Sequence, residues 1–178
     1  MKLKITLCVA LAVLLQSALR AIWQPLVYID LPLIAVVYFA LRRDIVQAVV
    51  IGAAAGLATD AWTGGLLGAG GFSKTLTAYL IAALSTRVML DNPLVRIPVI
   101  AGAAAFDPVV YVLLNRLLGR QVFVPFAETA AYKLIWTTII GTIAFYVLDL
   151  FFSDRARQRR QFAFRRRAAR RSLSRRKI

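Results

Sequence analysis

Apolar residues along the chain fall into six segments, which short polar or glycine-rich stretches separate. Long, nearly uncharged runs of this kind are candidates for helices that cross a lipid bilayer. We therefore expect an all-α integral membrane protein, with six transmembrane helices in a compact bundle. The expected segments are residues 1–19, 26–41, 45–59, 72–86, 97–118 and 130–152.

The first two segments each carry a complication. Residues 1–19 begin with two lysines before the apolar run, as a signal peptide does, but Arg20 stands where a cleavage site needs small residues. We therefore expect an uncleaved first helix. In the second segment Asp30 and Pro32 interrupt 16 residues, which as a helix would reach about 24 Å, short of the roughly 30 Å hydrocarbon core. This segment is either a broken helix that borders a cavity or a short helix that starts after Pro32.

The third and fourth segments are joined by a glycine-rich stretch, residues 60–74, that carries its own charges. We expect a non-helical turn here. Because backbone polar groups near lipid must be satisfied by protein or water, the turn should be buried or line a cavity at the membrane edge. Before it, Gly52 and Gly56 form a small-xxx-small face, which favours close packing either within this protein or against another chain.

Asp107 is the strongest single candidate for a functional carboxylate, because it lies in the middle of the fifth segment. A charge at bilayer depth costs about 2.5–3.5 kcal/mol on insertion scales, so it is expected to have a purpose. The alternative is structural: Asp107 could tie down a kink at Pro108, or pair with Arg116 or Lys133.

Residues of the turn form the remaining candidate site. Asp60 either stabilises the turn, close to Lys74, or binds a partner or ligand. Asp149 is expected to pair with arginines of the carboxyl-terminal tail. The candidate partner or pocket residues are Asp60, Trp62, Gly64, Gly65, Gly68, Lys74, Tyr79 and Asp107.

Composition supports the membrane class and argues against catalysis. The chain is 60% hydrophobic with a mean hydropathy of +0.71, well above soluble domains. It has no histidine and a single cysteine, Cys8, in an apolar segment, so we expect no metal, no cofactor and no enzyme activity. The sequence GAGGFSKT is not a phosphate-binding loop, because Ser73 precedes Lys74 where that motif has glycine.

Positive charge is concentrated at the carboxyl end. Of 23 Lys and Arg residues, twelve follow residue 154, and all 8 acidic residues precede residue 155, so the first 154 residues carry only +3 of the net charge of +15. We expect a membrane domain over residues 1–153 and a polybasic tail over 154–178, disordered or on the membrane surface, that binds anionic lipids rather than nucleic acid. Its lipid-binding candidates are Arg155, Arg157, Arg159, Arg160, Arg165, Arg166, Arg167, Arg170 and Arg171.

The same charges predict orientation. With six spans and both termini cytoplasmic, 18 cations lie on the inner side and 5 on the outer side, and the tail decides the difference. The glycine-rich turn then faces outward.

The order of motifs resembles the rod shape-determining protein MreD family. It consists of YIDLPLIAVVYFALRRD at residues 28–44, G-xxx-GL-xx-D at 52–60, a glycine-rich turn with Leu67-Gly68, and L-x-AYL at 76–80. The stretch Gly70–Lys74 and the long arginine tail depart from the family pattern. Residues that match it are Tyr38, Leu41, Arg42, Gly52, Gly56, Asp60, Gly68 and Tyr79.

The resemblance implies a six-span protein of the bacterial inner membrane, with a fold similar to the substrate-binding subunits of energy-coupling-factor transporters. It also implies a non-enzymatic scaffold that binds MreC and other rod-complex proteins and helps position peptidoglycan synthesis along the lateral wall. The alternative is a vitamin-binding subunit of such a transporter, with its ligand between the second segment and residues 60–74.

Overall fold

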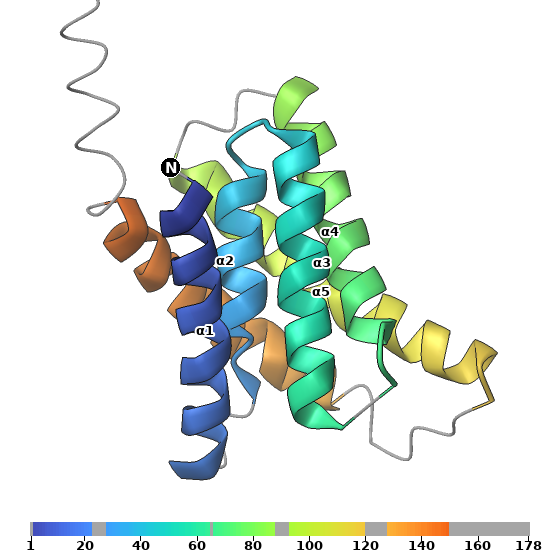
Figure 1. The fold of residues 1–178 in the computed structure, drawn as a ribbon. Helices are drawn as coiled ribbons and strands as arrows, with labels where there is room; N and C mark the ends of the chain where they lie inside the picture. Colours follow the sequence, from blue (N-terminus) through green and yellow to red (C-terminus); the bar gives the residue numbers. More distant parts are fainter. Residues whose placement is uncertain (1, 23–27, 65, 88–92, 120–127, 150–178) are drawn as a thin grey trace, which may run out of the picture. The chain divides into compact units, whose positions relative to one another are not determined.

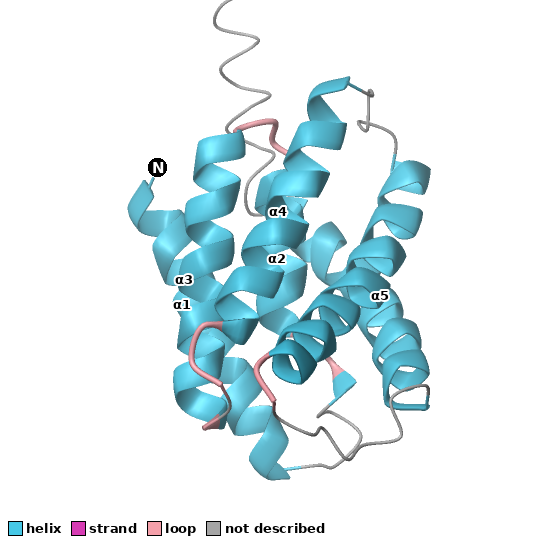
Figure 2. Cartoon of the chain, turned by 90° about the vertical axis from the view of Figure 1, so that its right-hand side faces the viewer, coloured by secondary structure: helices cyan, strands magenta, loops and turns pink. Residues whose placement is uncertain are grey.

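The computed structural model describes residues 2–22, 28–64, 66–87, 93–119 and 128–149, which are helical apart from short turns. Figure 2 shows no strand in this described part, so the all-helical class is confirmed. The chain divides into two units, Met1–Thr142 and Ile143–Ile178, and the features below belong to the first. The helices are α1 (Lys2–Ile22), α2 (Leu31–Ala40), α3 (Ile45–Thr63), α4 (Ala69–Arg87) and α5 (Pro93–Leu117), followed by Glu128–Asp149.

Helix α2 is the centre of the first unit. It lies between α1 and α3 (Figure 1) and also packs against α4 and α5. All residues from Pro32 to Ala40 are buried. A ten-residue helix that is apolar on every side has no solvent-facing stripe, as expected of a helix enclosed by others.

Asp30 and Pro32 lie at the start of α2 and do not break the helix. Asp30 is the N-cap, and its Oδ1 accepts a hydrogen bond from the backbone N–H of Leu33 at 2.9 Å. Pro32 lies in the first turn, where the missing N–H has no helical partner in any case. The second segment is therefore a short helix that starts at Leu31, one residue before the proline.

The expected turn at residues 60–74 is largely helical, which corrects the sequence interpretation. Helix α3 continues through Asp60 to Thr63 and ends at Gly64, whose φ of 64° is left-handed. Helix α4 already begins at Ala69. The connection is thus confined to Gly64–Gly68, within which residue 65 lies outside the described part.

Small residues bring α3 and α4 together in the most extensive helix contact of this unit. A Cβ added to Gly52 would lie 2.8 Å from the carbonyl oxygen of Lys74, and one added to Gly56 would overlap the backbone of Gly70 and Gly71. Gly52 and Gly56 therefore face α4 of the same chain.

Three described helices are long and apolar enough to cross a membrane, namely Ile45–Thr63, Val95–Leu117 and Glu128–Asp149. Helix α5 begins at Pro93, earlier than the expected residue 97, and runs through Pro108 without ending. The boundary expected at residues 153–154 and the whole tail lie outside the described residues.

Candidate functional site

Asp60 holds the start of α4 from the neighbouring helix. Its Oδ2 accepts hydrogen bonds from the backbone N–H groups of Gly68 at 2.9 Å, Gly70 at 2.9 Å and Gly71 at 3.1 Å, and its Oδ1 accepts a longer one from Gly70 at 3.2 Å. The first N–H groups of a helix have no partner within the helix and form the positive end of its dipole. The buried carboxylate of Asp60 accepts from these N–H groups and places a negative charge at the positive end of the dipole. Asp60, which belongs to α3, therefore caps α4.

Four charged side chains from four helices meet in the interior. Lys74 Nζ lies 2.8 Å from Asp30 Oδ2 and 3.2 Å from Asp107 Oδ2. Lys133 Nζ lies 2.9 Å and 3.1 Å from the same two oxygens. Each carboxylate oxygen therefore bridges both ammonium groups in a closed ring of alternating charge. We call Asp30, Lys74, Asp107 and Lys133 the charge cluster.

The charge cluster is neutral and deeply buried. The side chains of Asp107, Lys74 and Asp30 are 4%, 5% and 11% exposed, and that of Lys133 is 21% exposed. Buried ion pairs are tolerated when the geometry is good and the remaining polar atoms are also bonded. Here the second carboxylate oxygen of Asp107, Oδ1, accepts a hydrogen bond from Ser73 Oγ at 2.7 Å. The same hydroxyl also lies 2.7 Å from the backbone carbonyl oxygen of Asp107.

Two polar side chains hold Asp30 in position. Gln16 of α1 accepts a hydrogen bond from the backbone N–H of Leu31 at 2.9 Å and donates one to the carbonyl of Ile29. Thr137, on the last helix, donates to the carbonyl of Tyr28 at 3.2 Å. These contacts fix the chain where it enters α2, so the N-cap carboxylate points at the two lysines.

A cavity of about 300 Å³ lies beside the charge cluster. Its lining comes from the start of α2, the end of α3, the start of α4, the second half of α5 and the start of the last helix. A size of several hundred cubic ångströms is in the range of small-molecule sites. Its charged lining residues are Asp30, Asp60, Lys74, Asp107, Arg116 and Lys133.

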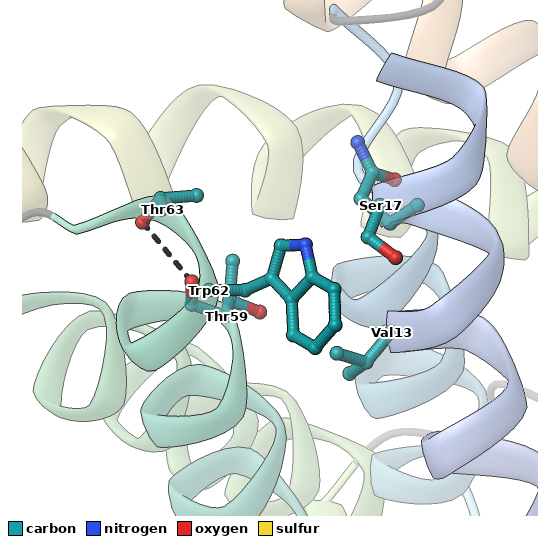
Figure 3. A pocket seen from close by; sticks show the side chains of 6 residues that line it. Val13, Ser17, Thr59, Trp62 and Thr63 are labelled. Atoms are coloured by element: carbon teal, nitrogen blue, oxygen red, sulfur yellow. Dashed lines mark hydrogen bonds between the residues drawn. The ribbon is translucent and has the colours of Figure 1, made fainter. Parts of the chain in front are cut away.

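Trp62 lies at a separate, smaller cleft between α1 and α3. In Figure 3 its indole ring extends toward Val13 and Ser17 of α1, while Thr63 donates a hydrogen bond to the Thr59 carbonyl at 3.0 Å. Trp62 is nevertheless 64% exposed. It is a surface residue of this end of α3 and does not line the larger cavity.

The structure brings together only part of the candidate set. Asp60, Lys74 and Asp107 line one cavity. Gly68 lies in the turn with a φ of 101°, and Tyr79 is exposed on α4. Lys74 binds Asp30 and Asp107, whereas Asp60 binds backbone N–H groups. Gly65 and the tail arginines lie outside the described residues.

Sequence reasoning missed Asp30, which it treated as an interruption of the second segment. It named Lys133 as one possible partner of Asp107, and the pair is confirmed at 3.1 Å. The sequence did contain a usable signal, because two aspartates and two lysines stand in or next to apolar segments. Isolated charges are costly there, so opposite charges are expected to pair.

The described residues are helical apart from short turns, and three of their helices are long and apolar enough to cross a membrane, which indicates an integral membrane protein. Comparison with protein families gives the finer assignment. Residues 2–155 match the family model of the rod shape-determining protein MreD, so the chain belongs to this family, whose role is in cell shape determination. No curated protein and no solved structure matches the chain.

Proposed function

We propose that this protein is a scaffold subunit of the rod complex in the bacterial inner membrane, where it binds MreC and helps position lateral peptidoglycan synthesis. The family match over residues 2–155 carries the proposal, because the family determines cell shape. A subunit of this kind works by holding other proteins in place and needs a stable membrane framework with exposed contact surfaces.

The proposed topology has six spans with both termini in the cytoplasm. The excess of cations on that side supports it, since the twelve cations after residue 154 favour the inner leaflet with its anionic lipids. In this orientation the Gly64–Gly68 turn and the nearby cavity lie in the outer half of the protein. The tail binds the membrane surface and leaves the outer end free for partners.

We place the partner contact at the outer end of α3 and the turn. Leu67 is 71% exposed and Trp62 is 64% exposed there, and Tyr79 is exposed on α4. Exposed aromatic side chains are enriched in the energetically important parts of protein interfaces. A single-span partner that packs against this end of the protein would bury Trp62 and Leu67.

The experiment is affinity co-purification of MreC with the full-length chain from rod-shaped cells that depend on it. Leu67→Ala and Trp62→Ala should reduce the recovered MreC severalfold and round the cells. The matched control is Leu84→Ala, which removes the same side chain from an exposed position near the other end of α4. Unchanged MreC recovery with both turn variants would rule out this contact, and no MreC with the unaltered chain would rule out the proposal.

The second candidate is a substrate-binding subunit of an energy-coupling-factor transporter, and the cavity of about 300 Å³ is the observation that favours it. Such a subunit must engage an ATPase module. Co-purification of ATPase subunits instead of MreC would reverse the order of the two proposals.

A further inference from the structure

The cavity beside the charge cluster has an imbalance between hydrogen-bond donors and acceptors. It is lined by three acidic residues, Asp30, Asp60 and Asp107, and all six of their carboxylate oxygens already accept a bond from this chain. The donors are backbone N–H groups, Ser73 and the two lysines. Each carboxylate oxygen is therefore already engaged within the chain.

The cationic residues retain donors. An ammonium group has three N–H donors, and the carboxylates account for two of those on Lys74 and two of those on Lys133. Among the described residues, the third donor of each has no acceptor. Arg116 adds five more guanidinium donors to the lining.

The charged lining residues are three acids and three cations, so the lining as a whole is neutral. The charge cluster pairs two of each, and the carboxylate of Asp60 accepts from three backbone N–H groups at the start of α4. Arg116 is therefore the cation of the lining that makes no ion pair with a carboxylate of the described residues. Tyr111, five residues before Arg116, also lines the cavity and carries a hydroxyl.

We propose that this cavity binds an anionic phosphate or carboxylate group, held by Arg116 and by the free donors of Lys74 and Lys133. Arginine suits such a group because its planar fork can make two parallel bonds to it. The hydroxyls of Thr59 and Thr63 already donate to carbonyls of α3, so they can only accept, for instance from a hydroxyl on the ligand. The anion can come from a lipid headgroup or from a water-soluble molecule.

The test uses the purified full-length chain in neutral detergent, with thermal unfolding followed by tryptophan fluorescence. One arm titrates inorganic phosphate at constant ionic strength. The other titrates phosphatidylglycerol in mixed micelles, with a diacylglycerol of the same acyl chains as the phosphate-free comparison. Stabilisation by both phosphate and phosphatidylglycerol indicates a site open to soluble anions, and stabilisation by phosphatidylglycerol alone indicates a lipid site.

Variants separate this site from the arginine tail. Arg116→Gln should weaken the apparent affinity about tenfold, which is the effect of losing one charge-assisted contact. Val112→Phe places a ring in the cavity and should abolish binding. The matched controls are Arg87→Gln, exposed in the last turn of α4, and Val109→Phe, exposed on α5; both should stay within twofold.

The proposal is overturned if neither phosphate nor phosphatidylglycerol stabilises the chain, or if Arg116→Gln and its control behave alike. Should Val112→Phe fail to fold, Arg116→Gln still decides the question, because Arg116 is exposed and lies outside the charge cluster. Binding of MreC is measured separately, so the two proposals fail independently.

Discussion

Replacing Asp107 by asparagine tests whether the charge cluster stabilises the fold as a unit. The amide keeps the shape of the carboxylate and an oxygen that can accept from Ser73, while its NH2 group replaces the oxygen that accepts from the two lysines. The change therefore removes the charge and the acceptor between the two ammonium groups. The cluster then carries two ammonium groups against one carboxylate. Removing one partner of a buried pair costs about 3–5 kcal/mol because the other charge is left uncompensated. We expect the lower end, since Lys133 is 21% exposed and can be partly hydrated from the cavity.

The assay is unfolding of the purified chain by sodium dodecyl sulphate in mixed micelles, followed by circular dichroism. Lys133→Gln is measured alone and together with Asp107→Asn. The double variant is neutral again and keeps the Lys74–Asp30 pair at 2.8 Å, so its loss should be smaller than the sum of the single losses by about 1–3 kcal/mol. Asp44→Asn is the matched control. Asp44 is the exposed N-cap of α3, and asparagine caps equally well, so its effect should stay within about 0.5 kcal/mol.

Strictly additive losses would refute the reasoning, because independent residues do not share a compensating charge. A result in which Asp107→Asn resembles Asp44→Asn would refute it as well. In that case the four side chains would be close together without contributing jointly to stability.

Two further predictions concern α3 and the start of α4. Gly56→Ala should lower the thermal midpoint and reduce the free energy of unfolding by about 1–3 kcal/mol, because the new Cβ overlaps the backbone of Gly70. The control is Gly102→Ala, whose Cβ meets nothing within 4 Å, and which should raise the free energy of unfolding by up to about 1 kcal/mol. Equal midpoints for the two variants would contradict the close packing of α3 on α4. Asp60→Ala should cost about 1.5–3 kcal/mol and speed amide hydrogen exchange at Gly68, Gly70 and Gly71, since their N–H groups lose a charged acceptor. Unchanged exchange there would mean that another group caps α4.

The helices could be predicted from the sequence because their apolar runs are long, but the 60–74 stretch could not. Glycine-rich sequence normally favours a turn over a helix. Here Gly70 and Gly71 are in α4 because Asp60 caps its N–H groups and because only glycine allows Gly56 to approach so closely. Both causes are contacts between helices, which are invisible in a linear pattern.

Individual residues of the candidate site could be predicted from the sequence, but most of their partners could not. Asp60, Lys74 and Asp107 are conspicuous because charges are rare in apolar segments. Their partners depend on which helices are neighbours. Lys74 meets Asp30 because α2 packs against α4. Lys133 meets Asp30 because the last helix lies against the start of α2, where Thr137 bonds the backbone of Tyr28 and Asp30. That Lys74 pairs with Asp30 and not with Asp60 follows from this packing and not from spacing.

The enclosure of α2 has a consequence for how the chain is made. Of the helices that pack against α2, α1 leaves the ribosome before it, whereas α3, α4 and α5 follow it. The ten residues of α2 therefore lack most of the helices that enclose them until the rest of the chain is synthesised. A chain truncated after α3 would leave α2 without two of its neighbours, and we expect cellular proteases to remove such fragments quickly.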